Sequence, residues 1–167
     1  MQRFNHSTIL IRNRQRIKKV NLLRLKQIIS ASLAELEISG AELGINLVGT
    51  KEMARVNWQF LQHEGSTDVI TFDHRECGVR SAERGVKIHG ELFICVDEAV
   101  VQAKQFGTSW QSEVMRYVVH GVLHLLGHDD QHVLALRKMK RAENRLVRAL
   151  SRRFSLAQIG RASKIGA

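Results

Sequence analysis

The 167-residue chain contains no proline and only two cysteines, Cys77 and Cys95. Without proline, the boundaries of helices and strands have to be read from glycines, capping residues and changes in the spacing of apolar residues. The two cysteines form neither a Cys-x-x-Cys pair nor the dense framework of a small secreted protein. We therefore expect reduced thiols and a cytoplasmic protein.

The sequence also lacks any apolar stretch that approaches the ~20 residues needed to cross a bilayer. Its first residues, from Met1 to His6, have no apolar core of the kind found in secretion signals. We expect a soluble protein with no membrane partner. A hydrophobic content of 44% suffices for one core of ordinary size, so residues 1–155 are predicted to form a single domain. Residues 156–167 are predicted to be a flexible C-terminal tail.

Aromatic residues make up only 5% of the chain. This does not favour a surface on which successive nucleic acid bases stack, so recognition of a nucleic acid would depend on its phosphates and its shape. Four aromatic residues fall on apolar faces of predicted helices or strands and are expected in the core, namely Trp58, Phe60, Phe72 and Trp110.

Acidic residues are the scarcer charged class, with 16 Asp and Glu against 26 Lys and Arg, and the formal net charge is +10. Such a charge attracts polyanions over long distances, which makes nucleic acid the first partner to consider. Seven basic residues fall between positions 12 and 26, and eight fall between positions 137 and 153. They form either two solvated faces or a groove that follows an RNA backbone. We favour the groove, because Arg141, Arg145 and Arg148 repeat along one stripe of the last predicted helix.

The spacing of apolar residues predicts four strands and five helices. The predicted strands are residues 8–11, 43–48, 67–72 and 88–96, with a loop over residues 73–87. The predicted helices are residues 22–36, 50–60, 97–106, 110–126 and 133–154. The order β-α-β-α-β-β-α-α-α predicts an α+β fold, with one mixed sheet of about four strands packed against helices.

Side-chain chemistry predicts how several of these helices begin and end. Gly40 is expected to close the first helix, and Thr50 is expected to cap the start of the second. Asp97 is expected to cap the third helix, and Thr108 with Gln111 to form a capping box for the fourth.

The most informative segment runs from His120 to His132. His120 and His124 are four residues apart on a helix that is apolar on nearly every face, so both imidazoles project from one side of a buried helix. A lone buried histidine is more often a hydrogen-bonded core residue than a metal ligand. Two at this spacing, followed closely by further histidines and aspartates, favour a bound metal ion. Gly127 can adopt the left-handed conformation that brings those later side chains back toward the pair.

The same histidine spacing occurs in zincin proteases, whose His-Glu-x-x-His motif uses the glutamate as general base. Gly121 takes the position of that glutamate here, so peptide hydrolysis by this route is not favoured. A glycine would instead allow another segment, or a bulky substrate, to approach the helix closely.

The pattern His120-Gly-x-Leu-His124-Leu-x-Gly127 resembles the signature of the YbeY family. Two further blocks are similar to that family: Asn57 followed by the run Thr67 to Phe72, and the strand Gly90 to Ile94. Glu113 also falls where the family has an acidic residue. The resemblance covers most of the chain. It implies a zincin-like metal helix and a metal-dependent, single-strand-specific endoribonuclease that acts in rRNA maturation and ribosome assembly.

The resemblance places the third metal ligand six residues after the second histidine, where this chain has Asp130 instead of the family's usual histidine. Two histidines and one carboxylate bind zinc and leave a fourth position open. The implied site therefore comprises His120, His124 and Asp130 with one zinc ion, and the same ligands also suit iron or manganese. His132 is the alternative third ligand, because His128 lies too close to the glycine turn to fold back.

A second departure from the family concerns a basic residue expected after the helix of Asn57, where the aligned position holds Leu61. An arginine there would contact a phosphate or stabilise charge during phosphodiester cleavage. Arg55 and Arg116 are the candidates to replace it, and the sequence does not choose between them. No residue of the motif is an obvious general base, and Asp68 either lines the cleft or only caps its strand.

The leading hypothesis is a metal-dependent endoribonuclease whose partner is RNA, either rRNA or the small ribosomal subunit. One alternative is a non-catalytic ribosome assembly factor with a structural metal, and another is a metal-dependent hydrolase of a different substrate. A structural site would fill the fourth metal position with a protein ligand such as His132. The sequence indicates no obligate protein partner.

Overall fold

The computed structural model describes residues 7–75 and 85–160. Its strands are β1 Ser7–Asn13, β2 Ile38–Val48, β3 Val69–Asp73 and β4 Val86–Cys95. Its helices are α1 Leu22–Glu35, α2 Thr50–Leu61, α3 Val96–Phe106, α4 Trp110–Leu125 and α5 Val133–Arg153, followed by the 3-10 helix η1 Leu156–Gly160. The predicted order of strands and helices is confirmed, and the molecule is a single α+β domain.

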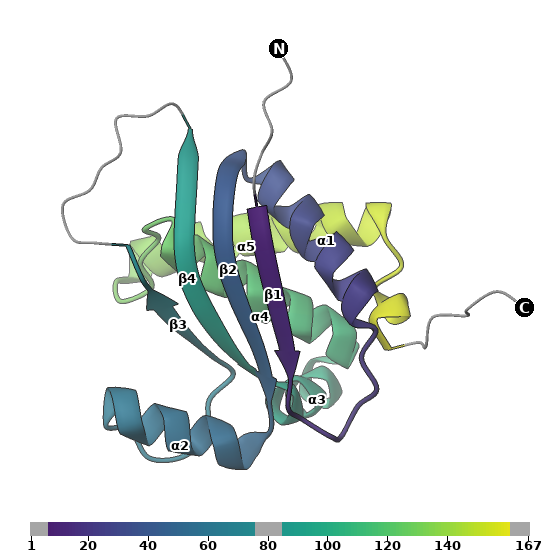
Figure 1. The fold of residues 1–167 in the computed structure, drawn as a ribbon, viewed down its shortest axis with the longest axis vertical. Coiled ribbons are helices and arrows are strands. Elements are labelled where there is room, and N and C mark those ends of the chain that lie inside the picture. The colour runs from purple at the N-terminus through teal and green to yellow at the C-terminus, as the bar shows by residue number, and fades with distance from the viewer. Residues whose placement is uncertain (1–6, 76–84, 161–167) are drawn as a thin grey trace, which may run out of the picture.

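The four strands form one sheet in the order β1-β2-β4-β3 (Figure 1). The strand β2 pairs in parallel with both β1 and β4, whereas β3 pairs antiparallel with β4. The sheet is therefore mixed, as predicted. A parallel pair needs a crossover connection, and α1 provides it between β1 and β2. The short strand β3 forms one edge of the sheet and packs on α4.

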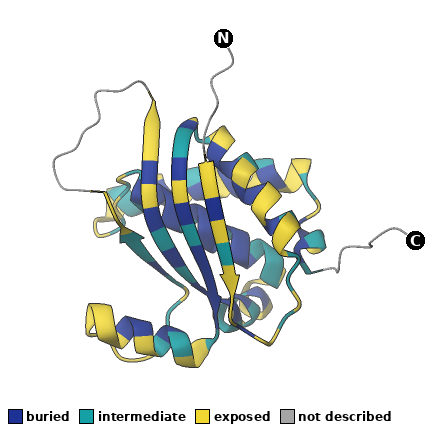
Figure 2. Ribbon diagram, in the orientation of Figure 1, coloured by how far each residue is buried: buried dark blue, intermediate teal, exposed yellow. Residues whose placement is uncertain are grey.

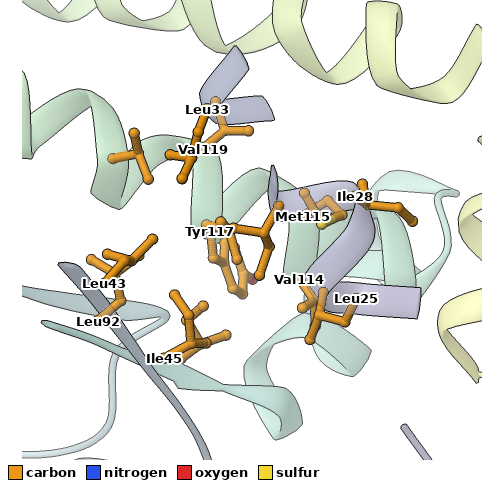
Figure 3. Packing of buried hydrophobic residues seen from close by; sticks show 14 of the residues in the cluster. Leu25, Ile28, Leu33, Leu43, Ile45, Leu92, Val114, Met115, Tyr117 and Val119 are labelled. Atoms are coloured by element: carbon orange, nitrogen blue, oxygen red, sulfur yellow. The ribbon is translucent and has the colours of Figure 1, made fainter. Parts of the chain in front are cut away.

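The main core lies between the sheet and the helices α1 and α4, with α5 packed against both helices behind the strands in Figure 1. Figure 3 shows side chains from α1, β2, β4 and α4 meeting there, among them Leu25, Ile45, Leu92 and Met115. Each of these four is fully buried, which contributes roughly 1.5–3 kcal/mol per side chain. Helix α4 is buried along most of its length (Figure 2), as its apolar sequence predicts.

Helix α2 covers only one end of the other face of the sheet. It packs there through a smaller cluster, formed by Val48, Met53, Val56, Ile70 and Cys95. Phe60 packs edge-on against Phe72 of β3, with ring centroids 5.1 Å apart. Trp58 and Phe60 are nevertheless 54% and 56% exposed, so the prediction that they belong to the core is wrong. Phe72 and Trp110 are partly buried, and each packs against one of the two clusters.

Three of the predicted helix ends are wrong. Gly40 lies inside β2, and Glu37 takes the left-handed conformation after α1 with φ of 55°. Thr50 is the first residue of α2, and its backbone N–H donates to the Asp97 carboxylate at 2.8 Å. Asp97 lies in the first turn of α3 and caps α2 instead of its own helix.

The start of α4 also differs from the prediction. Ser109 is the N-cap, and its hydroxyl accepts a hydrogen bond from the N–H of Ser112 at 3.1 Å. Thr108 donates its hydroxyl to Glu113 at 2.6 Å in place of a capping box with Gln111. This pairing places a polar contact at the base of the helix that carries the two histidines.

The C-terminal segment is ordered further than predicted. Leu156 and Ile159 of η1 are buried in the main core, and the N–H of Asn21 donates to the carbonyl of Ile159 at 2.7 Å. Residues 156–160 are therefore not a flexible tail. Residues 161–167, Cys77 and most of the predicted loop over residues 73–87 lie outside the described residues. Within the described part of the chain, no helix has the length and apolar content that a bilayer crossing requires.

Candidate metal centre

The turn at the end of α4 brings together side chains that lie close in sequence. His120 and His124 occupy the last two turns of this helix and are partly exposed. Gly127 has φ of 91°, as predicted, and the N–H of His128 closes the turn on the carbonyl of Leu123 at 3.0 Å. The chain then reverses, so Asp130, in the loop before α5, faces the two imidazole rings.

Three donor atoms converge at this point. His120 Nε2 lies 3.1 Å from His124 Nε2, and Asp130 Oδ2 lies 3.8 Å and 3.5 Å from these two nitrogens. Ligands of a tetrahedral zinc ion, bound at ~2.0–2.1 Å, lie about 3.3 Å from one another. The observed spacing therefore fits one ion. Among the described residues, no other group of three or more His, Cys, Asp or Glu brings its donor atoms this close.

The outer nitrogen of each ring faces a hydrogen-bond acceptor. His120 Nδ1 lies 3.1 Å from Glu143 Oε2, and His124 Nδ1 lies 3.1 Å from the carbonyl oxygen of His128. Both acceptors favour a proton on Nδ1, which leaves the Nε2 lone pairs directed toward Asp130. Two lone pairs and a carboxylate oxygen repel one another unless a cation lies between them. The chemistry of this donor set therefore fits a divalent metal ion.

Glu143 is a site residue that the histidine motif does not reveal. It is buried on α5, in the apolar stripe between Met139 and Val147. Burial favours its neutral form, but hydrogen bonds from His120 and Arg116 outweigh burial and lower the pKa of Glu143. Burial also opposes a charge on His120, yet the hydrogen bond and charge of Glu143 raise the pKa of this ring. An acidic residue within a buried apolar stripe is the signal that would have identified it.

Arg116 continues this network along α4. Its Nη1 donates to Glu143 Oε1 at 2.8 Å and to Asn144 Oδ1 at 2.7 Å. Its Nε lies 4.0 Å from Oε2 of Glu113, the buried carboxylate that accepts the Thr108 hydroxyl. Glu113, the acidic residue noted in the sequence, thus lies beside an arginine and does not approach the metal ligands.

A cavity of about 470 Å³ opens beside His120. Asp68 lines it, and the same carboxylate accepts the backbone N–H of Val69 at 2.8 Å, so both predicted roles of Asp68 are observed. Tyr117 also lines the cavity. Its hydroxyl is buried and has no hydrogen-bond partner in the part of the chain that the structure describes. Burial, the largest cause, raises the pKa of Tyr117, as do the nearby charges of Asp68 and Glu113.

The structure distinguishes between several residues that the sequence left open as candidates for the third ligand and for the basic residue of the site. His132 is exposed at the N-cap of α5 and does not join the three converging donors, whereas His128 contributes its carbonyl oxygen. Arg55 lies on α2, is 71% exposed and pairs with Glu52 at 3.6 Å. Arg116 is 29% exposed and lines the cavity beside His120.

The predicted arginine stripe lies on the outer face of α5. Arg141, Arg145 and Arg148 line a groove of about 360 Å³ together with Asn144. Asn144 also lines the cavity beside His120, so the groove and the cavity adjoin at this residue. The N-terminal basic segment is partly neutralised, since Arg12 and Arg14 lie near the carboxylates of Glu91 and Glu52.

Gly121 faces the sheet between the two histidines. A Cβ at this position would lie 2.5 Å from the side chain of Leu92 and 3.1 Å from the Thr71 hydroxyl. The close approach expected at Gly121 is therefore made by β3 and β4. A side chain at this position would require the end of the Leu92 side chain to shift.

These features define a small α+β protein with a partly exposed His-His-Asp centre, carried by a buried helix beneath a mixed sheet. The family model described as Endoribonuclease YbeY matches residues 10–151. This match extends over most of the chain, so the chain belongs to the YbeY family.

Three curated relatives named Endoribonuclease YbeY illustrate the similarity. The Myxococcus xanthus protein is 34% identical over 143 residues, which are 86% of this chain and 47% of that protein. The Salinibacter ruber protein is 36% identical over 109 residues, which are 65% of this chain and 69% of that protein. The Chlorobium phaeovibrioides protein is 31% identical over 127 residues, which are 76% of this chain and 80% of that protein. The chain thus spans about half the length of the Myxococcus xanthus relative.

The fold is also similar to that of a Thermotoga maritima protein solved in solution. The TM-score is 0.61 at 22% sequence identity, and the match covers 96% of this chain and 100% of the other. At this identity the likeness concerns the fold alone.

Proposed function

We propose that this chain is a metal-dependent endoribonuclease that cuts single-stranded RNA in rRNA maturation and ribosome assembly. The observation that carries the proposal is the convergence of His120 Nε2, His124 Nε2 and Asp130 Oδ2 beside a cavity that adjoins a row of arginines. Membership in a family whose matched relatives are named endoribonucleases supports this activity. The proposed partner is rRNA or the small ribosomal subunit, and the proposed location is the cytoplasm.

One zinc ion is the proposed cofactor. His120, His124 and Asp130 would hold it and leave its fourth position open, as in catalytic zinc sites, and the same ligands accept iron or manganese. When bound, a divalent cation supplies Lewis acidity for hydrolysis of the phosphodiester bond.

The protein groups around the ligands orient the two imidazole rings. The Glu143 carboxylate and the His128 carbonyl each accept from Nδ1 when that nitrogen carries the proton of the neutral ring. In this tautomer both Nε2 atoms are free to bind a metal ion, as is usual when a hydrogen-bond acceptor lies behind a metal-binding histidine. Because Glu143 comes from α5, this orientation depends on the packing of α5 against α4.

The arginines of α5 provide the proposed binding surface for the RNA backbone. Arg141, Arg145 and Arg148 share a groove that reaches the cavity beside His120 through Asn144. Contacts of this kind bind phosphates without reading base sequence. A flexible single strand can bend into a recessed centre more easily than a stiff duplex, which supports the proposed preference for single strands.

The proposal is tested by metal analysis of the purified protein together with cleavage of a defined RNA, offered as a single strand and as a duplex. We expect about one zinc per chain, as a site with three protein ligands requires. Cleavage of the single strand should disappear with a chelator and return with zinc, while the duplex stays intact. Single-strand cleavage that persists in the chelated, metal-free protein would contradict the proposal.

The variant His124→Ala separates a catalytic metal from a structural one, with His63→Ala in the exposed loop after α2 as control. A catalytic role predicts that His124→Ala folds but loses metal and cleavage, while His63→Ala keeps both. Unfolding of His124→Ala would indicate a structural metal. Binding of RNA by the wild-type protein without cleavage would indicate an assembly factor.

A further inference from the structure

The cavity beside His120 contains two basic side chains among its described lining residues, Arg116 and Lys140. Arg116 and His120 are one helical turn apart on α4 and therefore project from the same face of the helix. Lys140 is exposed on α5 and has no ion pair within the described ranges. The two cations thus differ in how firmly the protein holds them.

Arg116 is anchored through only one side of its guanidinium group. Both Nη1 protons are used, because Nη1 donates to Glu143 Oε1 and to Asn144 Oδ1. Nη2 and Nε donate no hydrogen bond to the residues that the structure describes, since the Glu113 carboxylate lies 4.0 Å from Nε. The Nε and Nη2 protons form a planar fork that matches two oxygens of a phosphate group.

The charge around this fork depends on the metal ion. Three carboxylates line the cavity, those of Asp68, Glu113 and Glu143, against the charges of Arg116 and Lys140. The Asp130 carboxylate adds a fourth negative charge at the adjoining centre. A bound divalent cation would offset this excess, so a phosphate should bind well only in the metal-loaded protein.

We propose that Arg116 is the residue that binds the scissile phosphate, through its Nε and Nη2 protons, beside the metal centre. This inference rests on the proposed ribonuclease function and names a catalytic residue for it. Arg55, on α2, pairs with Glu52 and does not line the cavity. Of the two cations in the cavity, Arg116 is the one held next to the metal centre, through the Glu143 carboxylate that also contacts His120.

The test compares four variants for cleavage of a short single-stranded RNA, for bound metal and for inhibition by inorganic phosphate. Arg116→Ala should lose roughly 100-fold in cleavage rate, the usual cost of removing one transition-state donor, and should recover partly as Arg116→Lys. Arg55→Ala removes a charge outside the cavity and should stay within about threefold of the wild-type rate, as expected for an exposed charge. Lys140→Ala removes the other cation of the cavity and should lose clearly less activity than Arg116→Ala.

Phosphate inhibition and metal content distinguish a phosphate-binding role of Arg116 from a purely structural one. Phosphate should inhibit the zinc-loaded wild type at least tenfold more strongly than Arg116→Ala, with equal metal content. If Arg116→Ala cleaves like the wild type, the inference fails while the ribonuclease function stands. If Arg116→Ala loses its metal, Arg116 acts only by orienting Glu143, and the inference fails.

A wild-type protein that cleaves no RNA would contradict the proposed function itself. Binding of inorganic phosphate to the zinc-loaded protein, measured by calorimetry, then still decides the role of Arg116. Equal phosphate affinity of wild type and Arg116→Ala overturns the inference, and a loss of at least tenfold supports it. The two failures are therefore distinguishable.

Discussion

The carboxylate of Glu143 joins two residues of α4, because Oε2 lies 3.1 Å from His120 Nδ1 and Oε1 accepts a hydrogen bond from Arg116 at 2.8 Å. A single buried side chain on α5 thus contacts both a candidate metal ligand and the proposed phosphate-binding arginine. The metal centre therefore depends on the tertiary contact between α4 and α5 as well as on the local histidine motif.

Replacing this carboxylate by an amide should weaken metal binding without removing a ligand. In Glu143→Gln the His120 ring loses a charged acceptor, and such changes behind a metal-binding histidine typically reduce affinity 10–100-fold. Competition with a chromophoric chelator measures the effect, with Glu64→Gln in the exposed loop after α2 as control. An affinity equal to that of the wild type would show that the contact does not support the metal centre.

The third ligand can be identified by substitutions within one short loop. Asp130→Ala should lose metal, whereas Asp130→His should retain it, because an imidazole also ligates zinc at this distance from the pair. Asp129→Ala and His132→Ala are the matched controls. Asp129 accepts the N–H of Gln131 at 2.9 Å, His132 lies at the start of α5, and neither joins the three donors. Loss of metal from His132→Ala, with Asp130→Ala unaffected, would reverse the assignment.

The convergence of the three candidate ligands could be predicted from the sequence because their arrangement is local. One helical turn separates His120 from His124, and the left-handed Gly127 returns the chain so that Asp130 meets them. The choice of Asp130 over His132 needed the family resemblance as well. No contact between distant elements was required for this part of the site.

The rest of the site follows from packing that apolar periodicity does not specify. Glu143 and Arg116 meet only because α5 lies against α4, and Asp97 caps α2 only because α3 begins beside it. Helix α2 shows the same limit of prediction from apolar spacing. The apolar pattern places Trp58 and Phe60 on a helix face but does not say whether another element covers that face.

The ion pair between Asp73 and Arg75, at the end of β3, should make the stability of the fold depend on pH. The hydrogen bond from Arg75, more than any other contact, lowers the pKa of Asp73. A carboxyl group whose pKa is lowered in the folded protein stabilises the fold at pH values above its ordinary pKa of about 3.9. This contribution is lost as the pH falls through the lowered pKa. Both side chains are about two-fifths exposed, so solvent screening limits the contribution to a few tenths of a kcal/mol.

Urea unfolding of the metal-free protein between about pH 5 and about pH 3 checks this expectation. Asp73→Asn should lower the free energy of unfolding at the upper pH and reduce its decline toward the lower pH. Arg75→Ala should produce the same flattening together with a further loss, because Arg75 also donates to the carbonyl of Leu125 at 2.6 Å. A pH dependence identical in wild type and Asp73→Asn would contradict the assignment.

Removing the hydroxyl of Tyr117 should not destabilise the fold, although the residue is buried in the main core (Figure 3). The hydroxyl has no hydrogen-bond partner among the described residues, so its burial costs free energy that Tyr117→Phe recovers. We expect the free energy of unfolding to stay equal or to rise by up to about 1 kcal/mol in this variant. Tyr117→Leu, which also removes ring volume, should lower it by more than about 1 kcal/mol. A clear loss of stability in Tyr117→Phe, measured by urea unfolding, would mean that the hydroxyl has a partner, such as a bound water molecule, in the folded protein.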